Sequence, residues 1–124
     1  MPSILLVDDS PDTLEMYALG LAFAGYRPLI AADADSALGQ VKSEHPDAVV
    51  TDLQLIGARD GWELIREIKS DPSTRPIPVV VLTGRTDSSI AASAQQAGCA
   101  AVLTKPCLPD ELARVLQRVL PAVA

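Results

Sequence analysis

Aromatic side chains, cysteines and basic residues are all scarce in this chain. Only 3% of the 124 residues are aromatic, and two cysteines, Cys99 and Cys107, are too few for the disulfide framework of a small secreted domain. Ten lysines and arginines stand against 16 aspartates and glutamates, which gives a formal net charge of −6. This balance argues against direct binding to nucleic acid or to an anionic membrane, because both need a basic surface.

Long hydrophobic runs and a targeting signal are also missing. No apolar run approaches the roughly 20 residues of a transmembrane helix. Residues 1–7 are too short for a signal peptide, because acidic residues follow at once. Apolar residues nevertheless make up 48% of the chain, an ordinary value for a globular protein. Length and composition therefore predict one domain over residues 1–124, located in the cytoplasm.

Five short apolar runs alternate with segments of helical spacing. The runs cover residues 4–7, 28–31, 48–50, 78–82 and 101–103, and the expected helices cover about 11–24, 35–43, 61–69, 87–97 and 109–120. Runs without polar alternation are typical of parallel strands that are covered on both faces. The pattern predicts an α/β fold, a doubly wound five-stranded parallel sheet of the flavodoxin-like (βα)5 type with strand order 2-1-3-4-5.

Polar residues follow four of the five runs. Asp8 and Asp9 come after the first, Asp52 after the third, Thr83 after the fourth and Lys105 after the fifth. Such sheets bind ligands at the carboxyl ends of their strands, so these side chains are predicted to converge. Three crowded carboxylates are costly to ionise unless a hard cation such as Mg²⁺ (or Mn²⁺) offsets their charge. A carboxylate beside a metal, an ammonium group and a hydroxyl has what a phosphoryl acceptor needs.

Each of these residues taken singly is more often structural, because aspartate is common in turns and at helix caps. As a set, they resemble a response-regulator receiver domain of two-component signalling, and the resemblance covers essentially the whole chain. It rests on Leu-Leu-Val-Asp-Asp-Ser-Pro at 5–11, Asp-Leu at 52–53, Asp-Gly-Trp-Glu-Leu at 60–64, Val-Val-Leu-Thr-Gly at 80–84 and Leu-Thr-Lys-Pro at 103–106.

The resemblance implies a role for each strand-end residue. Asp52 would be the phosphoacceptor. Asp9 and Asp52 would ligate Mg²⁺ directly, Asp8 largely through water, and Gln54 through its backbone carbonyl. Thr83, Gly84 and Lys105 would contact the phosphoryl group, and the bond between Lys105 and Pro106 would be cis.

The resemblance also implies partners. The phosphoryl group would come from a phosphohistidine of a histidine kinase or phosphotransfer protein, and phosphorylation would switch binding to an unknown downstream protein. The chain would catalyse only its own phosphorylation and dephosphorylation, so we do not expect an enzyme acting on external substrates. Two alternatives stay open: a receiver excised from a longer hybrid kinase or transcription regulator, and a Mg²⁺-dependent phosphatase.

Two positions depart from the family pattern. Receivers usually carry tyrosine or phenylalanine three residues before the lysine, and this ring moves when the threonine is drawn to the phosphoryl group. In this chain the threonine is Thr83, but the position of the ring is occupied by Val102, which cannot act as an aromatic switch. The segment after Asp52 has Ile56 where the family often has proline, and it is one residue longer than usual. The alternative for this second departure is a neutral surface insertion.

The first expected helix carries few charges on the side that we expect to face outward. We interpret Leu14, Ala18 and Ala22 as an apolar docking or dimer surface on that side. The alternative is an exposed helix that tolerates alanines. The protein is accordingly expected to be a monomer or a weak dimer.

Overall fold

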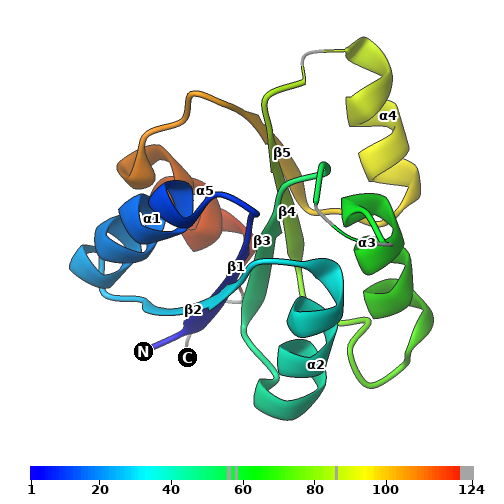
Figure 1. Cartoon of the computed structure of the whole chain (residues 1–124), viewed down its shortest axis with the longest axis horizontal. Coiled ribbons are helices and arrows are strands. Elements are labelled where there is room, and N and C mark those ends of the chain that lie inside the picture. Colours follow the sequence, from blue (N-terminus) through cyan, green and yellow to red (C-terminus); the bar gives the residue numbers. More distant parts are fainter. Residues whose placement is uncertain (56, 58, 86, 121–124) are drawn as a thin grey trace.

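The computed structural model describes residues 1–55, 57, 59–85 and 87–120. Five parallel strands form one sheet in the order β2-β1-β3-β4-β5. The strands are β1 (Ser3–Val7), β2 (Arg27–Ala31), β3 (Ala48–Thr51), β4 (Val79–Thr83) and β5 (Ala101–Thr104); the helices are α1 (Pro11–Phe23), α2 (Ala34–Glu44), α3 (Gly61–Ser70), α4 (Ser88–Gln96) and α5 (Pro109–Val119). Figure 1 shows α1 and α5 on one face of the sheet and α2, α3 and α4 on the other. The predicted fold class and strand order are confirmed.

Local signals set the helix boundaries. The Ser10 hydroxyl accepts a hydrogen bond from the Thr13 backbone N–H at the start of α1, and Pro11 occupies the first helical position. Asp33 and Asp60 cap α2 and α3 in the same way. Each predicted helix end lies within one residue of the observed end. None of the described helices combines the length and the apolar character needed to cross a membrane.

The central strands are buried on both faces, which explains their unbroken apolar sequences. Leu5, Val49 and Val81 pack toward α2, α3 and α4, while alternate residues such as Leu6 and Val50 pack toward α1 and α5. Two hydrophobic cores therefore hold the strands in register. This leaves the carboxyl edge of the sheet free for polar side chains.

The predicted orientation of α1 is wrong at Leu14. That side chain is only 6% exposed and belongs to the core between the sheet and α5, together with Tyr17 and Leu21. Met16 in the same helix is exposed. The helix is apolar on more than one side, so its sequence pattern does not set which side faces the sheet. Of the predicted docking residues, Ala18 is half-buried and Ala22 is exposed.

The cysteines are free thiols, Cys107 buried and Cys99 partly so. Burial raises the pKa of the Cys99 thiol to about 11, and the nearby Lys69 ammonium offsets this only in part. Because the thiolate is the reactive form, a rise from 9.0 to about 11 lowers the reactive fraction about a hundredfold near neutral pH.

We therefore expect Cys99 to react with iodoacetamide about a hundredfold more slowly than a free cysteine derivative at pH 8. The measurement is mass spectrometry of the peptide that contains Cys99, sampled over time, with N-acetylcysteine as the reference. Fragment ions of this peptide distinguish alkylation at Cys99 from alkylation at Cys107. A rate for Cys99 equal to that of the reference would contradict the burial of this thiol.

Candidate functional site

Three of the predicted residues meet at the carboxyl edge of the sheet. The Lys105 Nζ atom lies 2.7 Å from Asp8 Oδ2 and 2.9 Å from Asp52 Oδ2. Both carboxylates are largely shielded from solvent, with side-chain exposures of 8% and 13%. Charge-assisted hydrogen bonds of this length are strong, and they are screened little in a shielded site. One ammonium group thus holds two carboxylates that follow neighbouring strands.

Backbone N–H groups fix the remaining carboxylate oxygens. Asp8 Oδ1 accepts from the Ser10 N–H at 2.9 Å, and Asp52 Oδ1 accepts from the Gln54 N–H at 3.2 Å. The Asp52 N–H in turn donates to the Val7 carbonyl, which extends the pairing between β3 and β1 by one residue. Each carboxylate is therefore held at both oxygens before any ligand arrives.

Opposing effects act on the Lys105 ammonium. Its partial burial lowers the pKa, but hydrogen bonds and charge attraction from Asp8 and Asp52 outweigh this, so the pKa stays above the ordinary lysine value. Lys105 is consequently protonated at neutral pH. Because protonation and folding are linked, the pairing of Lys105 with the two aspartates stabilises the fold fully at pH values below the lysine pKa of the unfolded chain. This contribution is lost only as the pH rises through the higher pKa that Lys105 has in the folded chain.

Thr83 and Gly84 complete the same edge. Thr83 is buried at the end of β4, its hydroxyl accepts from the Arg85 N–H at 3.2 Å, and its carbonyl accepts from the Lys105 N–H at 2.8 Å. Gly84 is exposed, with open space where a Cβ would stand. The hydroxyl and the ammonium group thus come from adjacent strands joined by a backbone hydrogen bond.

Asp9 differs from Asp8 and Asp52, because it is not one of the carboxylates paired with Lys105. It is exposed and lines a separate cavity of about 370 Å³ with Asp33, Asp35 and Arg59. Asp8 is buried, whereas Asp9 is exposed, although both follow the end of β1. Among the residues that the structure describes, no three His, Cys, Asp or Glu side chains are grouped closely enough to hold a metal ion.

The donors nevertheless fit Mg²⁺. This ion takes hard oxygen ligands, keeps several waters and needs only one or two protein carboxylates. Asp8 and Asp52 present such oxygens side by side on Lys105, and Asp9 adds a third carboxylate next in the chain. A preformed cage of three carboxylates is therefore not required.

The loop after β5 is attached to α1. The peptide bond between Lys105 and Pro106 is cis, as the sequence resemblance implies. The buried Tyr17 hydroxyl donates to the Cys107 carbonyl two residues after that bond. This contact was not foreseen from the sequence.

Gly61 makes a close contact that sequence reasoning did not foresee, although this residue belongs to the motif quoted at 60–64. It begins α3, and its N–H donates to the Leu53 carbonyl at 2.9 Å. A Cβ at Gly61 would stand 2.2 Å from the Asp52 carbonyl oxygen and 2.7 Å from the Leu53 Cα. The helix therefore starts directly against the backbone of Asp52. The sequence signal for this close approach was a glycine placed immediately after an aspartate that caps the helix.

The two positions that depart from the family pattern lie in different surroundings. Val102 is half-buried, lies opposite Val81 in the sheet and packs against the core under α2, α3 and α4. Ile56 lies outside the described residues. Gly57 in the same loop is exposed and has a φ of +115°, a backbone conformation that favours glycine.

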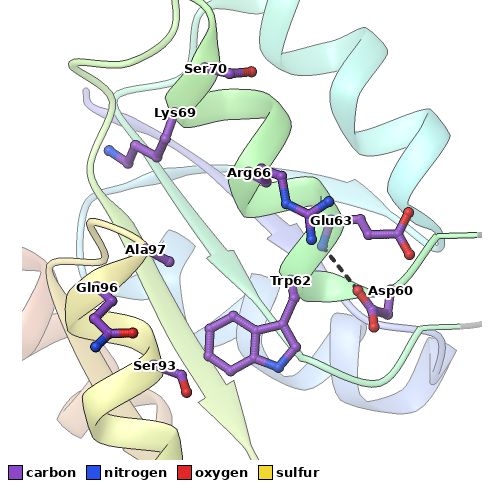
Figure 2. A pocket seen from close by; sticks show the side chains of 9 residues that line it. All are labelled: Asp60, Trp62, Glu63, Arg66, Lys69, Ser70, Ser93, Gln96 and Ala97. Atoms are coloured by element: carbon purple, nitrogen blue, oxygen red, sulfur yellow. Dashed lines mark hydrogen bonds between the residues drawn. The ribbon is translucent and has the colours of Figure 1, made fainter.

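A larger cavity, of about 740 Å³, lies between α3 and α4 and contains none of the strand-end residues. Figure 2 shows the Trp62 indole projecting into it toward α4, while the Asp60 carboxylate turns back to the Glu63 N–H. Trp62 is the chain's single tryptophan and directly follows Gly61, so we expect its fluorescence to report on the segment that packs against Asp52.

Known proteins are similar to this chain in both sequence and fold. The chain matches the response regulator receiver domain family over residues 4–117. It is 34% identical over 117 residues to the phosphate regulon transcriptional regulatory protein PhoB of Escherichia coli (strain K12), which covers 94% of this chain and 51% of PhoB. The chain thus spans about half the length of this curated relative.

Solved structures agree with the sequence comparison. The chemotaxis response regulator CheY4 of Vibrio cholerae superposes with a TM-score of 0.89 at 29% identity, covering 97% of this chain and 99% of CheY4. The receiver domain of the sensor histidine kinase PA1611 from Pseudomonas aeruginosa PAO1, solved with a magnesium ion coordinated in its active site cleft, gives 0.85 at 32% identity and covers 94% and 95%. This chain belongs to the response regulator receiver domain family of two-component systems.

Proposed function

We propose that Asp52 accepts a phosphoryl group from a phosphohistidine of a histidine kinase or phosphotransfer protein. The observation that carries this proposal is the Lys105 Nζ atom within hydrogen-bond distance of both Asp52 and Asp8. The hydrogen bond from Lys105 holds the Asp52 carboxylate at the carboxyl edge of the sheet, where one of its oxygens can act as a nucleophile.

In the proposed reaction, a carboxylate oxygen of Asp52 forms a bond to phosphorus while the bond from phosphorus to the donor imidazole nitrogen breaks. The electron pair of that bond returns to the imidazole, which leaves as a neutral ring once protonated. The Lys105 ammonium and the Thr83 hydroxyl stabilise charge on the transferred oxygens, and Gly84 leaves room for them. Water later attacks phosphorus, the bond between phosphorus and the Asp52 oxygen breaks, and inorganic phosphate leaves the restored carboxylate.

The metal belongs to the same proposal. Asp8, Asp9, Asp52 and the Gln54 carbonyl would hold Mg²⁺, which supplies positive charge beside the phosphoryl oxygens when bound. The chain's own residues hold Asp52 in place, through Lys105 on one oxygen and the Gln54 N–H on the other. We also propose that the protein acts in the cytoplasm, that it does not turn over external substrates, and that phosphorylation changes its affinity for a downstream protein. Nothing in the comparisons supports a Mg²⁺-dependent phosphatase.

Incubation with Mg²⁺ and acetyl phosphate, followed by intact-mass spectrometry, tests this function. The native protein should gain one phosphoryl group, and Asp52→Asn should gain none, because an amide is not a nucleophile of this kind. Asp12→Asn, at an exposed aspartate of α1, is the matched control and should be phosphorylated normally. An adduct on Asp52→Asn, or none on the native protein once Trp62 fluorescence shows that Mg²⁺ is bound, would refute the assignment.

A further inference from the structure

Tyr17 links α1 to the loop between β5 and α5. Its ring is buried with Leu14 and Leu21 in the core between the sheet and α5, and its hydroxyl donates to the Cys107 carbonyl. Burial raises the pKa of the phenol above its ordinary value, so the hydroxyl is protonated and able to donate at neutral pH. Among the residues that the structure describes, this is the only hydrogen bond between α1 and residues 105–108.

The Cys107 carbonyl depends on this donor. In the described part of the chain, no other hydrogen bond reaches it, because the first backbone N–H groups of α5, those of Glu111 and Leu112, donate to the Leu108 carbonyl. The bond lies in a buried region, and a buried carbonyl that loses its donor is costly. The hydroxyl of Tyr17 therefore favours one position of the loop.

Gly20 holds the far end of the same loop. A Cβ at Gly20 would stand 2.2 Å from Pro109 Cβ, so α1 is in direct contact with the first residue of α5. Tyr17 and Gly20 are three residues apart and lie on one side of the helix. That side of α1 thus holds the chain at two points, by a hydrogen bond at Cys107 and by close packing at Pro109.

The loop also carries Lys105, whose backbone is attached on both sides. The Lys105 N–H donates to the Thr83 carbonyl at 2.8 Å, which fixes the chain against β4. The next attachment is the Cys107 carbonyl, two residues later. The residue between them is Pro106, and its ring removes one backbone rotation. A shift of Cys107 is therefore transmitted to Lys105 through a short and stiff segment.

The Lys105 side chain has little freedom to absorb such a shift. Its Nζ atom lies 2.7 Å from Asp8 Oδ2 and 2.9 Å from Asp52 Oδ2. Tyr17 lines a small pocket with both aspartates, and it lines a cavity of about 560 Å³ with Lys105 and Cys107. Its hydroxyl donates to the loop and not to either carboxylate. Its influence on the carboxylates therefore passes through the loop.

We propose that Tyr17 is a positioning residue for phosphoryl transfer, because its hydrogen bond to the Cys107 carbonyl fixes the loop that places the Lys105 ammonium group beside Asp52. This inference rests on the proposed function, since the position of the ammonium group affects the rate only if Asp52 is the phosphoacceptor. Tyr17 acts through Lys105 and is not itself a catalytic residue.

Tyr17→Phe tests the proposal, because it removes the hydroxyl and keeps the ring in the core. A displacement of about 1 Å can slow a reaction about a hundredfold, and a loosened loop moves Lys105 by part of that distance. Phosphorylation by acetyl phosphate and Mg²⁺, followed by intact-mass spectrometry, should therefore be about fivefold to tenfold slower than in the native protein. The rate is measured where circular dichroism shows the variant fully folded.

Tyr26→Phe is the matched control. Tyr26 is the other of the two tyrosines, and it precedes β2 at the amino edge of the sheet, opposite the site. The same atom is removed there, and the rate of phosphorylation should stay at the native value.

A double-mutant cycle separates positioning of Lys105 from a general loss of structure. Lys105→Met removes the ammonium group, so Tyr17→Phe added to it should change the rate less than about twofold. The acetyl phosphate concentration is set so that every variant has a measurable rate. Equal slowing in both backgrounds, or a native rate for Tyr17→Phe in a protein that is phosphorylated, overturns this inference alone. A native protein that acetyl phosphate does not phosphorylate overturns the proposed function and this inference with it.

Discussion

Gly20→Ala should lower the free energy of unfolding by about 2 kcal/mol. Gly20 lies in α1, where a Cβ would stand 2.2 Å from Pro109 Cβ and 2.9 Å from Pro109 Cγ. Pro109 is the first residue of α5, and its ring cannot rotate away. Overpacking of this kind typically costs roughly 1–3 kcal/mol, and a contact this short belongs at the upper end. The better helix propensity of alanine returns about 1 kcal/mol, so a net loss remains.

Gly39→Ala is the matched control for this prediction. Gly39 lies in the interior of α2, and a Cβ there would meet nothing within 4 Å. Alanine has a better helix propensity than glycine and meets no steric conflict at this position. The free energy of unfolding of this variant should therefore rise by about 0.5–1 kcal/mol. Urea denaturation of both variants, followed by circular dichroism, gives the two free energies. If the free energy of unfolding changed by the same amount and in the same direction in both variants, the close approach of α1 to α5 would be contradicted.

The sequence predicted the sheet well because the relevant signals are local. Unbroken apolar runs at residues 48–50 and 78–82 correspond to strands buried on both faces. Polar residues after those runs fall at one edge for any parallel sheet, so Asp8, Asp52, Thr83 and Lys105 could be placed together in advance.

The orientation of α1 could not be obtained in the same way. When a helix has apolar residues on several sides, the shape of the surface formed by the sheet and α5 decides which side is buried. In this structure Leu14 is buried there and Met16 is not. Contacts between distant segments were equally inaccessible. The Tyr17 hydroxyl reaches the Cys107 carbonyl 90 residues away, and Gly20 meets Pro109, only because the folded chain brings these elements together.

Gly61→Ala should impair both the fold and the phosphoacceptor. The atoms that a Cβ would meet are the Asp52 carbonyl oxygen at 2.2 Å, the Leu53 Cα at 2.7 Å and the Asp52 carbonyl carbon at 3.1 Å. All three are backbone atoms, so no side-chain rotation relieves the contact. Either α3 moves away from β3, or the backbone of Asp52 shifts. We expect the free energy of unfolding to fall by about 2 kcal/mol, the overpacking cost less the propensity gain.

The second effect concerns the position of Asp52. Displacement of a reacting group by about 1 Å can slow a reaction about a hundredfold, so we expect phosphorylation of Gly61→Ala by acetyl phosphate to slow at least tenfold. The rate should be measured where circular dichroism shows the variant fully folded, so that a loss of stability cannot account for it. Gly39→Ala should be phosphorylated at the native rate. A Gly61→Ala variant that loses stability but keeps the native rate would mean that α3 moves and Asp52 does not, which would contradict the proposed positioning role.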